Sequence, residues 1–304
     1  MTAPTSNETA GNETAGDATI GEPVTRPRSV WDGSGARWLF LPPAVLLVIG
    51  LLGPLVAVVV AGSADHGLAG MFAEPFHSDL FLRAAWRTLW LSALVTAGTW
   101  VVGTIYALAL GLAPRWLRRM LFGALFLTFW VSLLVRTYGW VLTLQPAGAL
   151  DRLVEALGLA DNGLGLYQTT AGLVPAMVHI MLPYLVLPVY AALRGIDPAH
   201  LRAARGLGAG EVLILRKVVL PALRAGSVAG AVIVFVMSLG FYVTPAFLGG
   251  PGGQLVAIVI GTEFGRLQNL GGAAAMGVVL LVATLGLYLL ADRFGKISEQ
   301  WERM

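Results

Sequence analysis

The stretch HLRAARGLGAGEVLILRKVVLPALRAG (residues 200–226) is basic and rich in glycine, yet it lies between two long apolar runs. Just before it, Asp197 and Pro198 form an N-cap and a first-turn proline, which predicts that a helix begins there. Alternating glycines then end this helix, and a second, amphipathic helix follows. We therefore predict a short helix–turn–helix hairpin at a membrane surface, within a loop that covers residues 194–224.

Outside this stretch the chain has the composition of a membrane protein. Of its 304 residues, 57% are hydrophobic and only 12% are charged, whereas a soluble domain carries about 25% charged residues. Apolar runs of roughly 20 residues, the length that crosses a bilayer, recur along the sequence. We predict an all-α integral membrane protein with six spans, at about residues 38–62, 88–113, 120–143, 171–193, 225–248 and 271–291.

The sequence divides into a tail and one membrane domain. Residues 1–29 contain the repeat NETAG twice and are expected to be a disordered cytoplasmic tail, whereas residues 30–304 are expected to form the six-helix domain. Between the first two spans, we predict that residues 63–87 form short amphipathic segments with turns. We also predict that residues 149–159 form an amphipathic interfacial helix and that residues 249–270 form a re-entrant or interfacial helix.

The distribution of positive charge predicts the orientation. Fifteen of the 20 lysines and arginines lie in the tail, in the loop after the second span, in the 194–224 loop and at the C-terminus. The opposite loops hold only Arg83, Arg87, Arg152 and Arg266. Because cytoplasmic loops carry the excess of positive charge, both termini are predicted to be cytoplasmic.

Composition also excludes several functions. Without cysteine, the chain has no disulfide, thiolate metal site or cysteine nucleophile. Its two lysines, Lys217 and Lys296, are not followed by Ser or Thr, so a Walker A phosphate-binding loop is excluded. The net charge of +3 is attributed to basic loops of a membrane protein, so no nucleic-acid partner is expected.

The spacing of the 200–226 stretch resembles a known signature. The pattern consists of R-A-A, three residues, Gly, nine residues and V-x-L-P. It is similar to the EAA signature of permease subunits of bacterial ABC importers. The matching positions are Ala203, Ala204, Gly208, Leu220 and Pro221, with Val218 in place of an isoleucine. Arg202 stands where the signature has glutamate, which inverts a charge. Taken on charge alone, the hairpin would be a basic anchor on anionic lipid.

Three further stretches look like permeases of the spermidine/putrescine type. They are FWVSLLVRTYGW (129–140), LPYLVLPVYAALRGIDPAHLRAARGLGA (182–209) and LGFYVTPAFLGGP (239–251). The resemblance implies a type I importer permease fold (MetI-like) in the bacterial inner membrane. It also implies a cargo that is a polyamine or a related solute, or a different solute within the same family.

The resemblance further implies an assembly. The expected partners are a second permease chain that is not identical to this one, two cytoplasmic ATPases and an external solute-binding protein. ATP and Mg²⁺ would bind the ATPases, so this chain is expected to be no enzyme and to hold no cofactor or metal. The residues expected to couple to an ATPase are Arg202, Ala203, Ala204, Arg205, Gly208, Leu220 and Pro221.

Residues that face the cargo are harder to identify. A polycation requires carboxylates or aromatic faces, and the candidates are Trp130, Arg136, Tyr138, Tyr184, Tyr242 and Glu263. The aromatic residues also suit interfacial belts and packing. Arg136 would repel a polycation, so it holds a structural pair or lines the cavity. We expect Glu263 to pair with Arg266, and His179 to be hydrogen-bonded within the bundle.

Two other classes of protein remain as alternatives. A transporter driven by an ion gradient would need acidic residues inside its spans, and the predicted spans contain essentially none. A membrane enzyme would need a catalytic motif, and neither His-Glu-x-x-His nor Gly-x-Ser-x-Gly occurs.

Overall fold

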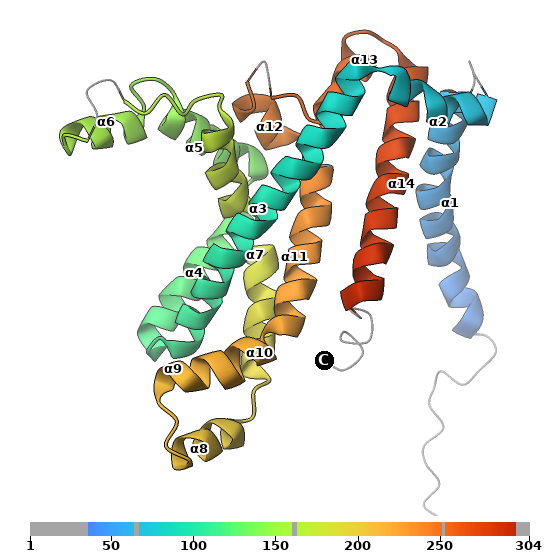
Figure 1. Cartoon of the computed structure of the whole chain (residues 1–304). Coiled ribbons are helices and arrows are strands. Elements are labelled where there is room, and N and C mark those ends of the chain that lie inside the picture. Colours follow the sequence, from blue (N-terminus) through green and yellow to red (C-terminus); the bar gives the residue numbers. More distant parts are fainter. Residues whose placement is uncertain (1–35, 64–66, 160–162, 251–252, 296–304) are drawn as a thin grey trace, which may run out of the picture. The chain divides into compact units, whose positions relative to one another are not determined.

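The computed structural model describes residues 36–63, 67–159, 163–250 and 253–295, and every regular element in them is helical (Figure 1). The predicted tail, residues 1–29, lies outside the described residues. The chain separates into two compact units, one that ends at Gly53 and one that begins at Pro54. This boundary falls inside the first helix, α1 (Ala36–Ser63).

Four described helices are long and apolar enough to cross a membrane: α1, α3 (Asp79–Leu112), α7 (Thr170–Arg194) and α14 (Leu270–Gly295). Two bent pairs also qualify. One joins α4 (Arg115–Trp130) to the segment that begins with α5 (Leu133–Leu144), and the other joins residues Glu211–Ala222 to α11 (Arg224–Leu239). Counting each pair as one span gives the six spans that the sequence predicts.

Shorter helices connect the long ones. Their bounds are α2 (Gly67–His77), α6 (Ala149–Ala156), α8 (Pro198–Gly206), α9 (Glu211–Ile214), the π-helical turn η1 (Leu215–Val219), α10 (Leu220–Ala222), α12 (Val243–Leu248) and α13 (Val256–Gly265). In the unit that begins at Pro54, α8, α9 and α10 lie at one end of the bundle, and α6, α12 and α13 lie at the other (Figure 1). We call the first of these the basic end.

The second span begins earlier than the sequence predicts. α3 starts at Asp79 instead of residue 88, because Ser78 caps it by accepting a hydrogen bond from the backbone N–H of Phe81 at 3.4 Å. Asp79 in the first turn adds a charge that suits a helix N-terminus. The predicted 63–87 loop therefore contains α2 and the first two turns of a long helix.

The third predicted span, residues 120–143, is broken rather than continuous. Val131 is extended and Ser132 has φ −51° and ψ 141°, so neither continues the helix, and α4 meets the segment Leu133–Ala156 at 104°. The Val131 N–H closes the last turn of α4 on Leu127 O, and the first turn of α5 closes from Arg136 N to Ser132 O at 3.1 Å. Because neither glycine nor proline marks this position, the sequence pattern does not reveal the break.

The fifth predicted span, residues 225–248, ends earlier than expected. α11 stops at Leu239 with Gly240 as its C-cap, and α12 is a separate helix. Pro245 explains why one helix cannot run through: it lacks the N–H that a continuous helix would direct at the carbonyl of Phe241.

The core of this unit lies where α3, α7 and α11 pack together. Glycines allow the close approach, since a Cβ atom added at Gly226 or Gly230 of α11 would meet the backbone of α7 at Pro188 or Leu185. The two glycines are four residues apart, which is the small-xxx-small spacing of tightly packed membrane helices. The packing of α11 on α7 therefore has no room for larger side chains.

Candidate functional site

The basic hairpin, which we define as residues 198–222, begins as the sequence predicts. Asp197 accepts a hydrogen bond from Ala199 N at 2.7 Å, and Pro198 occupies the first turn of α8. The helix ends in a Schellman motif, in which Gly208 N donates to Arg205 O at 2.9 Å and Ala209 N donates to Ala204 O at 3.0 Å. Gly208 has φ +79°, a left-handed conformation that favours glycine.

An ion pair closes the hairpin across this turn. Arg205 Nε lies 3.1 Å from Glu211 Oε1, and Arg205 Nη2 lies 3.4 Å from Glu211 Oε2. The guanidinium sits near the C-terminus of α8 and the carboxylate at the N-terminus of α9, so each charge also suits its helix end. Arg205 is thus engaged inside the hairpin, whereas Arg202 is exposed and makes no hydrogen bond or ion pair with any described residue.

The tip of the hairpin exposes apolar side chains. Leu207, directly before the turn, is 89% exposed, and Val212 and Leu213 on α9 are also exposed. Ala203 is exposed and Ala204 is half-buried on the same helix as Arg202. A surface of small and apolar residues beside an unpaired arginine is suited to binding another protein.

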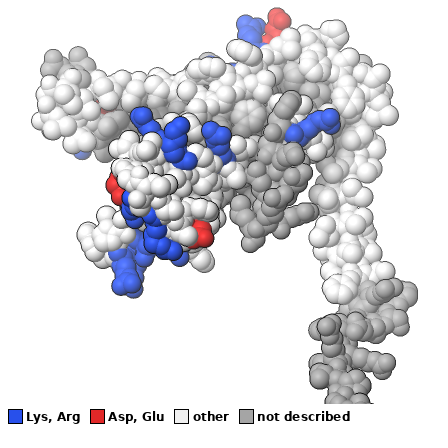
Figure 2. Space-filling view, turned by 60° about the horizontal axis from the view of Figure 1, so that its bottom comes forward, with Lys and Arg blue, Asp and Glu red and all other residues white. Residues whose placement is uncertain are grey.

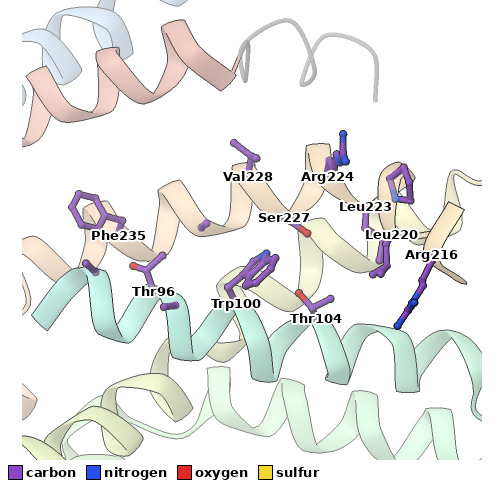
Figure 3. Close-up of a pocket in the computed structure, with 14 residues that line it drawn as sticks. Thr96, Trp100, Thr104, Arg216, Leu220, Leu223, Arg224, Ser227, Val228 and Phe235 are labelled. Atoms are coloured by element: carbon purple, nitrogen blue, oxygen red, sulfur yellow. The ribbon is translucent and has the colours of Figure 1, made fainter. Parts of the chain in front are cut away.

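Leu220 and Pro221 do not lie on the α8 surface with the other signature residues. They belong to the segment between the turn and α11, and they line a groove beside α3 (Figure 3). The helix widens into η1 just before Pro221, where Leu220 N donates to Leu215 O. This wider turn accommodates a proline, which has no N–H and crowds the carbonyl four residues earlier.

The groove has a volume of about 800 Å³ and lies between α3 and the start of α11. Trp100 and Thr104 line it from α3, and Ser227 and Leu220 line the facing side (Figure 3). Arg216 extends toward α3 at one end of the groove. The signature's V-x-L-P portion is therefore positioned against the spans and not at the hairpin tip.

Positive side chains gather over the basic end (Figure 2). Nine lysines and arginines belong to the helix ends and short helices of this end: Arg115, Arg118 and Arg119 at the start of α4, Arg194 in the last turn of α7, Arg202 and Arg205 on α8, Arg216 and Lys217 on η1, and Arg224 at the start of α11. The charge asymmetry read from the sequence thus exists in three dimensions, while the cytoplasmic orientation of this face stays a prediction.

At the opposite end, two of the predicted cargo-facing residues lie around α12. Tyr138 of α5 packs on Phe247 of α12 with ring centroids 5.4 Å apart. The ring of Tyr242 lies against Gly261 of α13, where an added Cβ would come within 2.9 Å of it. A buried hydrogen bond of 2.9 Å between the hydroxyls of Thr137 and Thr244 ties α5 to α12.

A small polar cavity of about 360 Å³ adjoins this cluster. Its walls come from α12, α13 and the connection between them, and include Tyr242, Gln254, Thr262 and Arg266. These groups offer a phenol face and hydrogen-bonding groups to a small solute. Among the described residues, no group of three or more histidines and acids lies together in a way that could hold a metal ion.

The other predicted cargo-facing residues lie elsewhere. Trp130 is 86% exposed at the end of α4, and Tyr184 of α7 packs on Phe129 of α4 with ring centroids 5.3 Å apart. The Nε of Arg136 is buried without a hydrogen-bond partner among the described residues. One turn later, Trp140 Nε1 donates to His179 Nδ1 at 3.3 Å, so His179 is hydrogen-bonded within the bundle as expected.

Glu263 does not pair with Arg266, contrary to our expectation. Its carboxylate accepts a hydrogen bond from Asn269 Nδ2 at 3.2 Å, because the chain turns back after α13 and Asn269 N also bonds to Glu263 O. Arg266 caps the end of α13 and lines the polar cavity instead.

Sequence reasoning missed three polar residues that fix these elements. Glu211 pairs across a tight turn, at a separation of six residues that helix spacing rules do not cover. The sequence does not indicate a role for Thr244, because an isolated threonine in an apolar run is compatible with many structural roles. Asp151 is buried and accepts hydrogen bonds from Ala147 N and Leu164 N, which organises the segment around α6.

Comparison with known proteins agrees with this architecture. Residues 100–303 match the family described as "Binding-protein-dependent transport system inner membrane component". The spermidine/putrescine transport system permease protein PotB of Escherichia coli is 28% identical over 217 residues, which cover 71% of this chain and 77% of that protein. PotB of Haemophilus influenzae is 29% identical over 210 residues, which cover 68% of this chain and 73% of that protein.

Solved structures support the fold. A bacterial alginate ABC transporter, in complex with its alginate pentasaccharide-bound periplasmic protein, contains a chain that matches with a TM-score of 0.72 at 20% identity. The match covers 88% of this chain and 96% of that one. Because the family model spans two thirds of the sequence, this multi-pass protein belongs to the inner-membrane components of binding-protein-dependent transport systems.

Proposed function

We propose that this chain is the permease subunit of an ATP-driven importer. In this proposal the basic end faces the cytoplasm, and α8 docks on an ATPase subunit that supplies the work of transport. A second permease chain completes the pathway, and an external solute-binding protein delivers the cargo. This chain itself performs no catalysis.

The observation that carries the proposal is the shape of the basic hairpin. Ala203 and Ala204 lie on α8, a helix without buried residues, and Gly208 lies in the Schellman turn that ends it, at the far end of the bundle from α12. Small side chains on that helix permit close approach of another backbone. After the turn at residues 207–210, α9, η1 and α10 follow one another directly and meet α11 at a bend of 55°, which gives a docked partner a helical link to the core.

The cargo we propose is a polyamine or a related small solute. The PotB relatives are named for spermidine and putrescine, and similarity to them runs over 71% of this chain. Within the described residues, the interiors of the long helices α1, α3, α7, α11 and α14 hold no carboxylate, and Glu263 of the short apolar helix α13 is hydrogen-bonded to Asn269. A polycation would therefore contact the aromatic faces of Tyr138 and Tyr242 and backbone carbonyl groups.

Two measurements test the proposal. The tagged chain is solubilised in mild detergent from cells that express the whole transport system, and an ATPase subunit is expected to co-purify with it. Uptake of labelled spermidine is expected to stop when ATP is depleted and to persist when an uncoupler collapses the ion gradient. The reverse pattern of uptake, with no co-purifying ATPase, would show a gradient-driven transporter.

The cargo is tested separately from the energy source. Unlabelled putrescine should compete with labelled spermidine, and a neutral sugar should not. An intact complex that hydrolyses ATP but imports neither polyamine would keep the importer assignment and remove the polyamine.

A further inference from the structure

We propose that the ATPase surface that receives α8 is an apolar socket with carboxylates on its rim, at least one of which pairs with Arg202. This inference rests on the proposed function and adds the chemistry of the partner. The permease signature has glutamate at this position, so this chain and its ATPase would form a charge-reversed version of the usual contact.

The first step of the argument is which charges on the hairpin are free. The acidic groups of the hairpin and its N-cap are both engaged: Asp197, directly before the hairpin, accepts a hydrogen bond from Ala199 N, and Glu211 pairs with Arg205. Arg202, by contrast, is exposed and has no partner among the described residues. The α8 side of the hairpin therefore presents an unneutralised positive charge to whatever it meets.

The second step is position. Arg202 and Arg205 are three residues apart and so lie on the same side of α8. Arg205 is fixed across the turn by Glu211, at 3.1 Å and 3.4 Å. Arg202 is thus the residue of the two whose guanidinium remains available, and a guanidinium pairs best with a planar carboxylate.

The third step is the apolar surface beside it. Leu207 is 89% exposed, and Val212 and Leu213 follow just after the turn. Figure 1 shows α8 beyond α9 and α10, as the element of the basic end that is farthest from α12. An apolar tip that extends away from the spans is expected to enter a pocket in a partner protein, with Arg202 contacting the rim of that pocket.

An anionic bilayer is the competing partner for a basic surface. Arg216 and Lys217 are exposed on η1, and Arg216 lines the groove beside α3, so these two residues are the expected contacts of this end with an anionic bilayer. α8 lies on the other side of η1 from the spans. The arrangement therefore favours a protein for Arg202.

The experiment uses the whole importer, purified through a tag on this chain and reconstituted in nanodiscs. The probe is retention of the co-purified ATPase, measured across a salt ramp in neutral phosphatidylcholine and in a mixture with phosphatidylglycerol. Arg202→Glu is compared with Arg202→Lys and with the matched control Lys217→Glu, which makes the same charge change on an exposed residue of η1. Size-exclusion profiles of each permease establish that the variants are folded.

We expect Arg202→Glu to weaken retention of the ATPase about tenfold, because it places like charges opposite each other. Arg202→Lys should have a smaller effect, and Lys217→Glu should have little. A second change replaces an acidic residue on the rim of the ATPase surface by lysine. This ATPase variant is expected to be retained by the Arg202→Glu permease and not by the wild-type permease. Equal retention by wild type and Arg202→Glu overturns the inference and leaves the proposed function standing. A loss that occurs only with phosphatidylglycerol assigns Arg202 to lipid and also overturns it. If the wild-type chain retains no ATPase, the proposed function fails and this inference fails with it.

Discussion

Replacing Gly208 by alanine should weaken the basic hairpin through backbone strain alone. Gly208 has φ +79°, and an added Cβ would meet nothing within 4 Å, so no steric clash with a neighbour contributes. A non-glycine residue in this left-handed region costs about 1–2 kcal/mol. That cost shifts the population of the native turn by a factor of about 5 to 30. Valine should cost more, because β-branched residues are disfavoured at positive φ.

The assay for Gly208→Ala measures two quantities on permease that has inserted normally: retention of the ATPase and uptake of labelled solute. The matched control is Gly206→Ala, two residues earlier, where an added Cβ also has open space and the backbone is helical. Alanine at that position should be neutral or slightly stabilising. If the two variants retain the same amount of ATPase and transport at the same rate, the left-handed turn is irrelevant to coupling and our reasoning about Gly208 is wrong.

Three further predictions concern stability and local contacts. A double-mutant cycle on Arg205 and Glu211, measured by thermal unfolding of the complex, should give a coupling free energy of only about 0.2–1 kcal/mol, because both side chains are exposed. A larger coupling would mean that the pair is buried in the assembly. Gly226→Val should lower the melting temperature of the detergent-solubilised chain by overpacking against α7, at a cost of about 1–3 kcal/mol, whereas Gly286→Ala, with no atom within 4 Å of the added Cβ, should not. Thr137→Val should cost about 1–3 kcal/mol by leaving a buried hydroxyl of α12 unpaired, and replacing both threonines by valine should recover part of that loss; no recovery would indicate that the cost comes from packing.

The sequence was a good guide wherever local chemistry determines structure. Asp197 and Pro198 start α8, and Gly208 ends it, because caps and left-handed turns depend on the residue itself. Hydrophobic length was enough to count the spans, since crossing a bilayer requires a minimum apolar run. These features need no knowledge of distant parts of the chain.

Features that depend on tertiary packing were not predictable in this way. The break at Val131 and Ser132 lies in an apolar run with no helix-breaking residue, so contacts elsewhere in the fold must determine it. The partner of Glu263 depended on how the chain turns after α13, where Asn269 reaches the carboxylate. The sequence grouped Leu220 with the α8 residues because one signature contains them all, whereas the structure places it in the groove beside α3.

That separation suggests a division of labour within the signature. Residues 211–222 form one helical segment, which meets α11 at a bend of 55° beside the buried Leu223. α11 packs on α7 through Gly226 and Gly230 with no free space, and it also packs on α3. The groove of about 800 Å³ lies between α3 and the start of α11. In the proposed assembly, a displacement of α8 by a docked ATPase would be resisted by α7 at Gly226 and Gly230 and would find free volume at the groove. Leu220 and Pro221 of the V-x-L-P portion line that groove. In the proposed assembly, they are where displacement of the hairpin would become displacement of a span, while the R-A-A-x-x-x-G portion would provide the contact.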